Sequence, residues 1–410
     1  PGKPDGAHTM SPFSLRISDR VAAVQPSATL TISTKAKELA ASGKNVIDMS
    51  AGEPDFNTPD FLIEAAYSAM KKGKTKYTAV AGTVELRKAI SAKFKNENGL
   101  DYPPEQISVA NGAKHTLYNI FQAILNPADE ILVPTPDWVS YKEMAHLASA
   151  VPVDVPTSQA DGFYLHREAL EKALTPRTRA LVINSPSNPT GALYSRKNLA
   201  EIAEFAVKNN ILVISDEIYE KLVYDGAEFV SIASLGPEIF ERTITVNGLS
   251  KSHAMTGWRI GYAGGPKALI SAINTLQSHS TSNAVTFCQD ASVAALNDTS
   301  DFVERCRSTF EKRRDLIHGL LTGIPGITCL KPLGAFYVFP DVSSFYGKTI
   351  MGKPINNGLE FCAHLLDTVH VAAVPGSAFD SDAHLRLSYA TSEENIREAI
   401  RRIAEFVKGA

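Results

Sequence analysis

Short runs of apolar residues recur along the middle of the chain and alternate with segments of helical periodicity. Between the runs, apolar residues return every three or four positions, as in Leu199, Ile202 and Phe205. Strands that are apolar throughout, and do not alternate with polar residues, are typical of a parallel sheet that helices bury on both faces. The pattern therefore predicts an α/β fold with a mostly parallel, seven-stranded sheet sandwiched by helices. The expected strands lie at 107–110, 130–133, 151–155, 180–183, 211–215, 243–246 and 260–263.

The segments on either side of this region have a different pattern. Upstream residues show helical periodicity, with one short apolar run between the helices. Downstream of about Ser280, two long helical stretches come first, followed by shorter strands with helices between and after them. The expected helices lie at 27–43, 59–72, 85–97, 285–296 and 302–321, and the expected strands at 46–49, 335–339, 371–373 and 385–389. This downstream order predicts a second, smaller α+β domain.

The length of the chain also indicates more than one domain, because 410 residues exceed what a single core usually serves. We predict a flexible leader at 1–12 and an N-terminal segment at 13–50 that packs with the small domain. A large, ligand-binding domain would span 51–300, and the small C-terminal domain would span 301–410.

Composition excludes several classes of function. With 44% hydrophobic and 21% charged residues and a formal net charge of -3, the chain has no basic field that would attract nucleic acid or an anionic membrane surface. No apolar run approaches the roughly 18 residues that span a bilayer. The four cysteines lie far apart and form no CxxC pair, so neither a metal site nor a disulfide framework is expected. A cytoplasmic protein fits this pattern best.

Polar residues follow the predicted strands at the edge where an open parallel sheet binds its ligands. The turn 111–114, Asn-Gly-Ala-Lys, opens a helix whose free backbone N–H groups suit a phosphate. The loop 184–191 is rich in Asn and Pro, and Asp216 stands where another strand stops, with Tyr219 one helical turn further. Taken singly, each of these is more often an ordinary connector or a helix cap.

One further stretch, 247–265, follows the strand at 243–246 and contains Ser250, Lys251 and Arg259. A lone lysine in a loop is usually a surface residue. The alternative is an amine nucleophile that forms a Schiff base with a carbonyl cofactor. A phosphate-type turn, an amide, a carboxylate, a phenol and a lysine at one sheet edge match the phosphate, ring atoms and aldehyde of pyridoxal 5'-phosphate (PLP).

Seven motifs, in order and spacing, resemble the class I aminotransferases of fold type I, and most of all the aspartate aminotransferase branch found in many bacteria. The resemblance runs from about Ser18 to the C-terminus. It implies a PLP-dependent homodimer with shared active sites that exchanges the amino group between aspartate and 2-oxoglutarate, giving oxaloacetate and glutamate. The motifs are AGEPDF (51–56), KYTAVAG (76–82), NGAKHTLYN (111–119), NSPSNPTG (184–191), SDEIYE (215–220), NGLSKSHAMTGWRIGYAGGP (247–266) and HLRLSYATSEENI (384–396).

The resemblance also implies roles for individual residues around the cofactor. Lys251 would hold PLP covalently and move the proton during the reaction, and Asp216 would pair with the ring nitrogen. Tyr219 and Asn188 would bind the ring oxygen. The remaining implied contacts are stacking by Trp138, phosphate binding by Gly112, Ala113, Lys114, Ser250 and Arg259, and a phosphate contact by Tyr77 of the neighbouring subunit.

Substrate recognition is implied at a second group of residues. Arg386 would hold the α-carboxylate, with Gly52, Asn188 and Trp138 beside it. In the animal and enteric branch a partner-subunit arginine reads the distal carboxylate, but the corresponding region here, 277–283, has no arginine. In the bacterial branch this role would fall to Lys114, Ser27 and Thr29. Many members that use prephenate carry a lysine just before the PSAT segment, where this chain has Gln25.

Three alternatives stay open at this point. In the first, the enzyme would have a broader class I specificity that includes prephenate or aromatic substrates. In the second, it would be a PLP-dependent β-elimination lyase, because the same proton abstraction starts transamination and β-elimination. A transcription regulator with an aminotransferase-like domain is disfavoured, because only about 20 residues precede the region of resemblance and no basic patch is present.

Overall fold

A seven-stranded sheet forms the centre of the protein, shown by a computed structural model that describes residues 14–26 and 28–409. The strand order is β2-β8-β7-β6-β5-β3-β4. Only β8 runs antiparallel to its neighbours among these strands, which confirms the predicted mostly parallel sheet. The strands are β2 (Ile107–Ala110), β3 (Glu130–Thr135), β4 (Val151–Pro156), β5 (Thr178–Asn184), β6 (Leu212–Asp216), β7 (Thr243–Gly248) and β8 (Gly261–Gly264).

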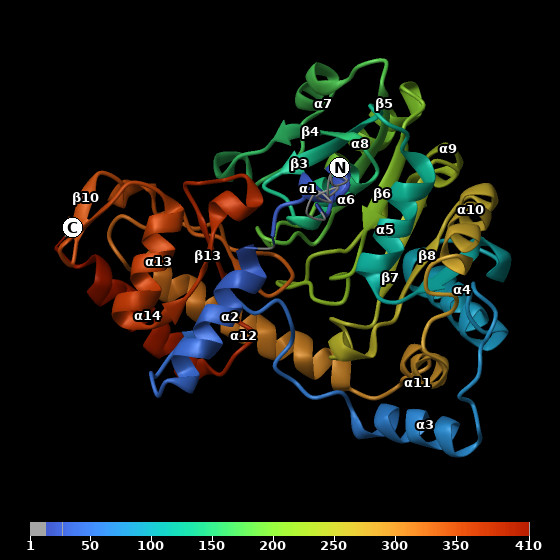
Figure 1. The fold of residues 1–410 in the computed structure, drawn as a ribbon, viewed down its shortest axis with the longest axis horizontal. Coiled ribbons are helices and arrows are strands. Elements are labelled where there is room, and N and C mark those ends of the chain that lie inside the picture. Colours follow the sequence, from blue (N-terminus) through green and yellow to red (C-terminus); the bar gives the residue numbers. More distant parts are fainter. Residues whose placement is uncertain (1–13, 27, 410) are drawn as a thin grey trace, which may run out of the picture.

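Helices cover both faces of this sheet (Figure 1). Neighbouring residues of one strand face opposite layers: Ile131 and Val133 belong to the hydrophobic cluster that includes α5, α6 and α10, whereas Leu132 belongs to the cluster that includes α7, α8 and α9. Because both faces are buried, a central strand such as β5 carries apolar residues at successive positions, from Ala180 to Ile183. The covering helices are α5 (Ala113–Ile124), α6 (Ser140–Leu147), α7 (Arg167–Ala173), α8 (Arg196–Lys208), α9 (Pro237–Phe240) and α10 (Lys267–Ser278).

Of the remaining helices before residue 300, α4 packs on β2, α1 contacts α6, and α2 contacts the C-terminal part of the chain. Helices α3 and α11 pack side by side at one end of the molecule (Figure 1). The side chain of Thr83 accepts a hydrogen bond from the N–H of Leu86 and caps α4, and Gly99, with φ 69°, ends that helix. These helices are α1 (Asp19–Ala22), α2 (Ala28–Ala41), α3 (Asp60–Lys71), α4 (Val84–Asn98) and α11 (Thr286–Leu296).

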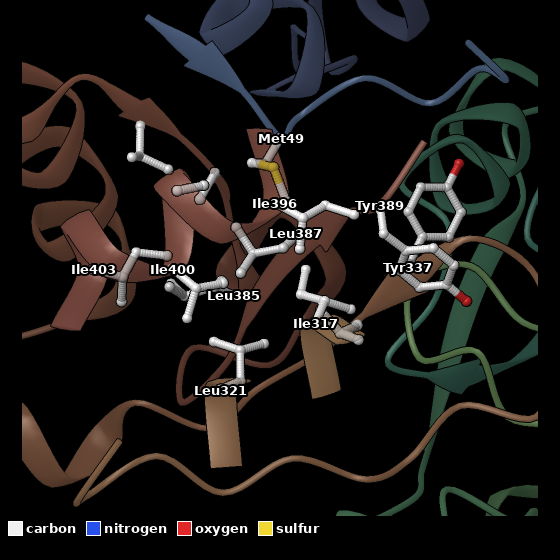
Figure 2. Packing of buried hydrophobic residues seen from close by; sticks show 14 of the residues in the cluster. Met49, Ile317, Leu321, Tyr337, Leu385, Leu387, Tyr389, Ile396, Ile400 and Ile403 are labelled. Carbon is white, nitrogen blue, oxygen red and sulfur yellow. The ribbon is translucent and has the colours of Figure 1, made fainter. Parts of the chain in front are cut away.

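A separate C-terminal unit, residues 302–409, lies beside the sheet, and its core is shown in Figure 2. It contains a three-stranded sheet of order β13-β14-β9 and the hairpin β10-β11. Ile396, Ile400 and Ile403 repeat at helical spacing on α14 and fill this core. Its elements are α12 (Phe302–Thr322), β9 (Tyr337–Val338), β10 (Lys348–Ile350), β11 (Lys353–Ile355), α13 (Gly358–Val369), β12 (Val371–Ala372), β13 (Val374–Pro375), β14 (Leu385–Ser388) and α14 (Glu393–Val407).

The N-terminal segment contacts the C-terminal unit, although the two are far apart in the sequence. Strand β1 (Ile47–Asp48) pairs in parallel with β12. On α2, Lys35 forms an ion pair of 2.8 Å with Asp367, and Ala36 packs on Leu366. This contact sets one wall of the site described below. The domain limits at residues 50 and 300 stay predictions.

The structure corrects some details of the predicted elements. Residues 217–220 form a turn after β6 instead of the expected helical turn. Pro59 precedes α3 as its cap and does not lie in its first turn. The β10-β11 hairpin was not predicted. The predicted leader and Ser27 lie outside the described residues. None of the described helices combines the length and apolar character that crossing a bilayer requires.

Candidate active site

A cavity of about 430 Å³ opens where the carboxyl ends of the strands face the C-terminal unit. The register of the sheet creates part of it, because Asn184 at the end of β5 pairs with Asp216 at the end of β6. Five cationic and two acidic side chains line the cavity, which gives it a net positive charge. The cationic residues are Lys37, Lys114, Lys251, Arg259 and Arg386, and the acidic ones are Glu53 and Asp216.

The cavity gathers most of the residues predicted from the sequence, with four exceptions. Tyr77 is 91% exposed and does not line it, and the side chain of Thr29, in the first turn of α2, is not described. Ser27 is the third, and Gly112 is the fourth, although its neighbour Ala113 lines the cavity. The predicted residues that line the cavity are Gly52, Ala113, Lys114, Trp138, Asn188, Asp216, Tyr219, Ser250, Lys251, Arg259 and Arg386.

Lys251 lies in the loop after β7, and its Nζ donates a hydrogen bond of 2.5 Å to the carbonyl oxygen of Gly52. Burial lowers the pKa of this amine from 10.5 to about 8. The positive charges of Arg386 and Arg259 act in the same direction, while Glu53 and Asp216 oppose them. The amine is therefore neutral in a useful fraction of molecules near pH 8, as a nucleophile or a general base requires.

Asp216 is buried at the end of β6, where the phenol of Tyr141 donates a hydrogen bond of 2.7 Å to its Oδ2. Burial raises the pKa of this carboxyl to about 6, and hydrogen bonds from Tyr141 and the N–H of Ile218 limit the rise. At neutral pH the carboxyl group is therefore ionised in most molecules, and its burial prevents water from screening the charge. Such a group binds a cationic ring nitrogen strongly.

Arg259 and the turn before α5 form an anion-binding corner. Gly112 caps α5 with φ 90°, and a side chain there would bring its Cβ within 2.3 Å of Arg259 Nη2. The guanidinium is held over the glycine by a hydrogen bond of 2.7 Å from Nη1 to the carbonyl oxygen of Thr256. The free N–H groups of the first helical turn and the guanidinium thus converge on one spot, as a phosphate requires.

Lys114 extends from the first turn of α5 over the ring of Trp138, with Nζ 4.8 Å from the ring centroid. Burial lowers the pKa of Lys114, and the positive charge of Arg259 lowers it further. The N-terminal end of a helix disfavours a cation, so this ammonium group gains from any anion that enters the cavity.

Arg386 is buried, at 2% exposure, on β14. It donates hydrogen bonds of 2.9 Å to Asn188 Oδ1 and 2.8 Å to the carbonyl oxygen of Ser50. Within the part of the chain that the structure describes, it forms no ion pair, and its Nε has no hydrogen-bond partner. Burial lowers the pKa of this guanidinium. A desolvated cation without a counter-ion favours a carboxylate ligand, which its two-donor fork fits.

Several residues of the cavity were not predicted. Tyr141 lies three residues after Trp138, which placed it within reach on a helix, but nothing in the sequence indicated its contact with Asp216. Tyr337 comes from the C-terminal unit. Leu30, Ser33 and Lys37 share one face of α2 and line the cavity because the opposite face packs on that unit. Their helical spacing was the available signal.

Known proteins resemble this chain over almost its whole length. The family model "Aminotransferase class I and II" matches residues 44–403. An aspartate aminotransferase of Bacillus sp. (strain YM-2) is 49% identical, over 96% of this chain and 99% of the relative. An aspartate/prephenate aminotransferase of Cereibacter sphaeroides is 47% identical over the same shares. The crystal structure of the aspartate aminotransferase from Rhizobium meliloti superposes with a TM-score of 0.93 at 46% identity, covering 96% of this chain and 99% of that one.

The fold, the cavity at the strand ends and these matches lead to one conclusion. The chain belongs to the class I and II aminotransferase family.

Proposed function

We propose that the protein is a PLP-dependent aminotransferase that exchanges the amino group between aspartate and 2-oxoglutarate. One observation carries the proposal. Lys251 bonds to the carbonyl of Gly52, and Arg386 bonds to the carbonyl of Ser50, two residues earlier. A short piece of backbone thus holds the amine of Lys251 close to the guanidinium of Arg386, which has no acidic partner among the described residues and can bind a carboxylate. In an α-amino acid the carboxylate is bonded directly to the α-carbon that reacts, so one substrate can contact both side chains.

The residues of the cavity fit PLP. The corner of Arg259 and Gly112 suits its phosphate, the buried carboxylate of Asp216 suits its ring nitrogen, and Tyr219 and Asn188 suit its ring oxygen. Trp138 offers an aromatic face. When bound, PLP supplies an electron sink and carries the amino group between the two substrates.

The side chains of this protein then have distinct tasks. Arg386 fixes the substrate through its α-carboxylate, so that the α-carbon lies near Lys251. Lys251 removes the proton from that carbon and returns a proton in the reverse half of the cycle, because its amine titrates near the working pH. Asp216 holds a positive charge on the ring nitrogen, and Tyr141 keeps the carboxylate oriented.

The positive charge of Lys114 in the cavity supports a preference for dicarboxylic substrates. The names of the relatives, aspartate aminotransferase and aspartate/prephenate aminotransferase, are consistent with this preference. The Lys114→Ala variant should lose about 10- to 100-fold in kcat/KM for aspartate, as expected for one charge-assisted contact. Alanine, which has no distal carboxylate, should lose less than about 3-fold. The measurement is a panel of amino donors with 2-oxoglutarate as acceptor. Equal losses for aspartate and alanine would remove Lys114 from this role.

Prephenate is the alternative acceptor. The presence of an aspartate/prephenate aminotransferase among the relatives favours the use of prephenate by this protein. Gln25 disfavours it, because many prephenate-using members have a lysine at this position. Including prephenate in the same panel decides between a narrow and a broad specificity.

A second copy of the chain would complete the assembly. Tyr77 is 91% exposed. Helices α3 and α11 pack on each other, and Phe61 and Tyr67 of α3 and Val285 at the start of α11 are also exposed. Exposed apolar side chains on two helices that pack together favour a protein partner, and the predicted contact of Tyr77 with the cofactor phosphate of a neighbour makes that partner a copy of this chain. Analytical ultracentrifugation should show a dimer, and a monomer with full activity would contradict the shared site.

A further inference from the structure

Tyr337 is a fully buried tyrosine of β9 whose side chain reaches the cavity from the C-terminal unit. Figure 2 shows it in the same core as Tyr389, Leu385 and Leu387. Tyr337 contacts two residues to which the proposed function gives separate roles: Arg386, which binds the substrate α-carboxylate, and Tyr219, which binds the ring oxygen of the cofactor.

The register of the small sheet places Tyr337 against Arg386. Tyr337 pairs with Ser388 on the antiparallel strand β14, so the two side chains share one face of the sheet. Arg386 is two residues from Ser388 and therefore lies on that face as well. Its guanidinium carbon is 4.5 Å from the centroid of the Tyr337 ring. The ring thus supports a buried cation that has no acidic partner among the described residues.

The hydroxyl of Tyr337 contacts the other part of the site. It lies 2.9 Å from the hydroxyl of Tyr219, with the two rings edge to face at 81°. This hydrogen bond crosses from the C-terminal unit to the loop after β6. Burial raises the pKa of both phenols, so each keeps its single proton at neutral pH. Only one of the two hydroxyls can donate to the other.

We propose that Tyr337 is a positioning residue with two separable tasks, an inference that rests on the proposed function. Its ring holds Arg386 in place for the substrate carboxylate. Its hydroxyl donates to Tyr219, which leaves the proton of Tyr219 to point at the cofactor's ring oxygen. Two hydrogen bonds in series polarise each other, so the donation by Tyr219 is stronger with Tyr337 present.

Two variants separate the tasks. Tyr337→Phe keeps the ring and removes the hydroxyl, whereas Tyr337→Leu removes both. Tyr389→Phe is the matched control, because Tyr389 is a buried phenol of the same core that donates to the carbonyl of Ala335 and does not line the cavity. The readouts are the pH midpoint of the visible absorbance of the PLP-loaded protein and the Kd of maleate, a non-reacting dicarboxylate, measured by calorimetry.

Tyr337→Phe should raise the absorbance midpoint by about half a pH unit or more, because a less stabilised ring oxygen makes the neighbouring proton bind more tightly. Its maleate Kd should stay within about two-fold of wild type. Tyr337→Leu should shift the midpoint too and weaken maleate binding about ten-fold, as loss of a desolvated cation–π contact predicts. Tyr389→Phe should change neither.

Three results would overturn this inference. They are an unmoved midpoint in Tyr337→Phe, equal maleate affinity in the two Tyr337 variants, or the same shifts in Tyr389→Phe. In each case a normal absorbance band in the wild-type protein leaves the proposed function standing. A wild-type protein that forms no such band with PLP would overturn the proposed function, and this inference with it.

Discussion

The Lys251→Ala protein should bind PLP without the visible, pH-dependent absorbance of the wild type, and its transamination rate should fall by more than about 10⁴-fold. Loss of general base catalysis alone accounts for about 10²- to 10⁴-fold, and loss of the covalent link adds to it. Absorbance spectra and single-turnover kinetics with aspartate measure the two effects separately. A variant that keeps the pH-sensitive band would refute the central role of Lys251.

Stability measurements distinguish this loss from unfolding. The pKa of Lys251 is about 8 in the folded protein and about 10.4 in an unfolded chain, so the unfolded state binds the proton more tightly. The stability of unloaded wild type should therefore rise with pH between about 8 and 10, and Lys251→Ala should lack this rise. Lys221→Ala is a suitable control, since Lys221 lies two residues after Tyr219 but pairs with Glu97 at 2.8 Å.

Arg386→Ala should lower kcat/KM by roughly 10²- to 10³-fold for every amino acid and 2-oxo acid alike. Every substrate carries the α-carboxylate, and removing one member of a buried charged pair costs about 2–5 kcal/mol. Most of the loss should be in KM, and PLP should still bind, because the corner of Arg259 and Gly112 and the carboxylate of Asp216 stay in place without Arg386.

Arg386→Lys refines this experiment. It keeps the positive charge and removes the two-donor fork, so it should recover part of the affinity but not the orientation of the substrate. A loss restricted to aspartate and glutamate in either variant would assign Arg386 to the distal carboxylate and overturn its proposed role.

The strand ends explain why much of the site was predictable. Lys251 and Asp216 each follow a buried apolar strand, and adjacent parallel strands end at the same edge, so a list of the residues after each strand already groups them. The sheet itself was predictable because most of its strands are short runs of buried residues, although β4 at its edge is partly exposed.

Other contacts depend on how segments far apart in the sequence pack together, and the local pattern of apolar and polar residues does not indicate this packing. Tyr337 reaches Tyr219 only because the C-terminal unit lies against the strand ends. Lys37 lines the cavity because β1 and α2 pack on that unit. The turn at 217–220 was mistaken for a helical one because Asp216 resembles a helix cap, whereas its carboxylate accepts a hydrogen bond from Tyr141 on another element.

The excess of cations in the cavity affects how the protein behaves in different buffers. Five positive groups facing two carboxylates attract small multivalent anions, and their attraction weakens as the ionic strength rises. Inorganic phosphate or sulfate should therefore compete with PLP for the corner formed by Arg259 and Gly112. Protein purified in phosphate buffer should reconstitute slowly, whereas the same protein exchanged into a dilute buffer without multivalent anions or primary amines should take up its cofactor quickly.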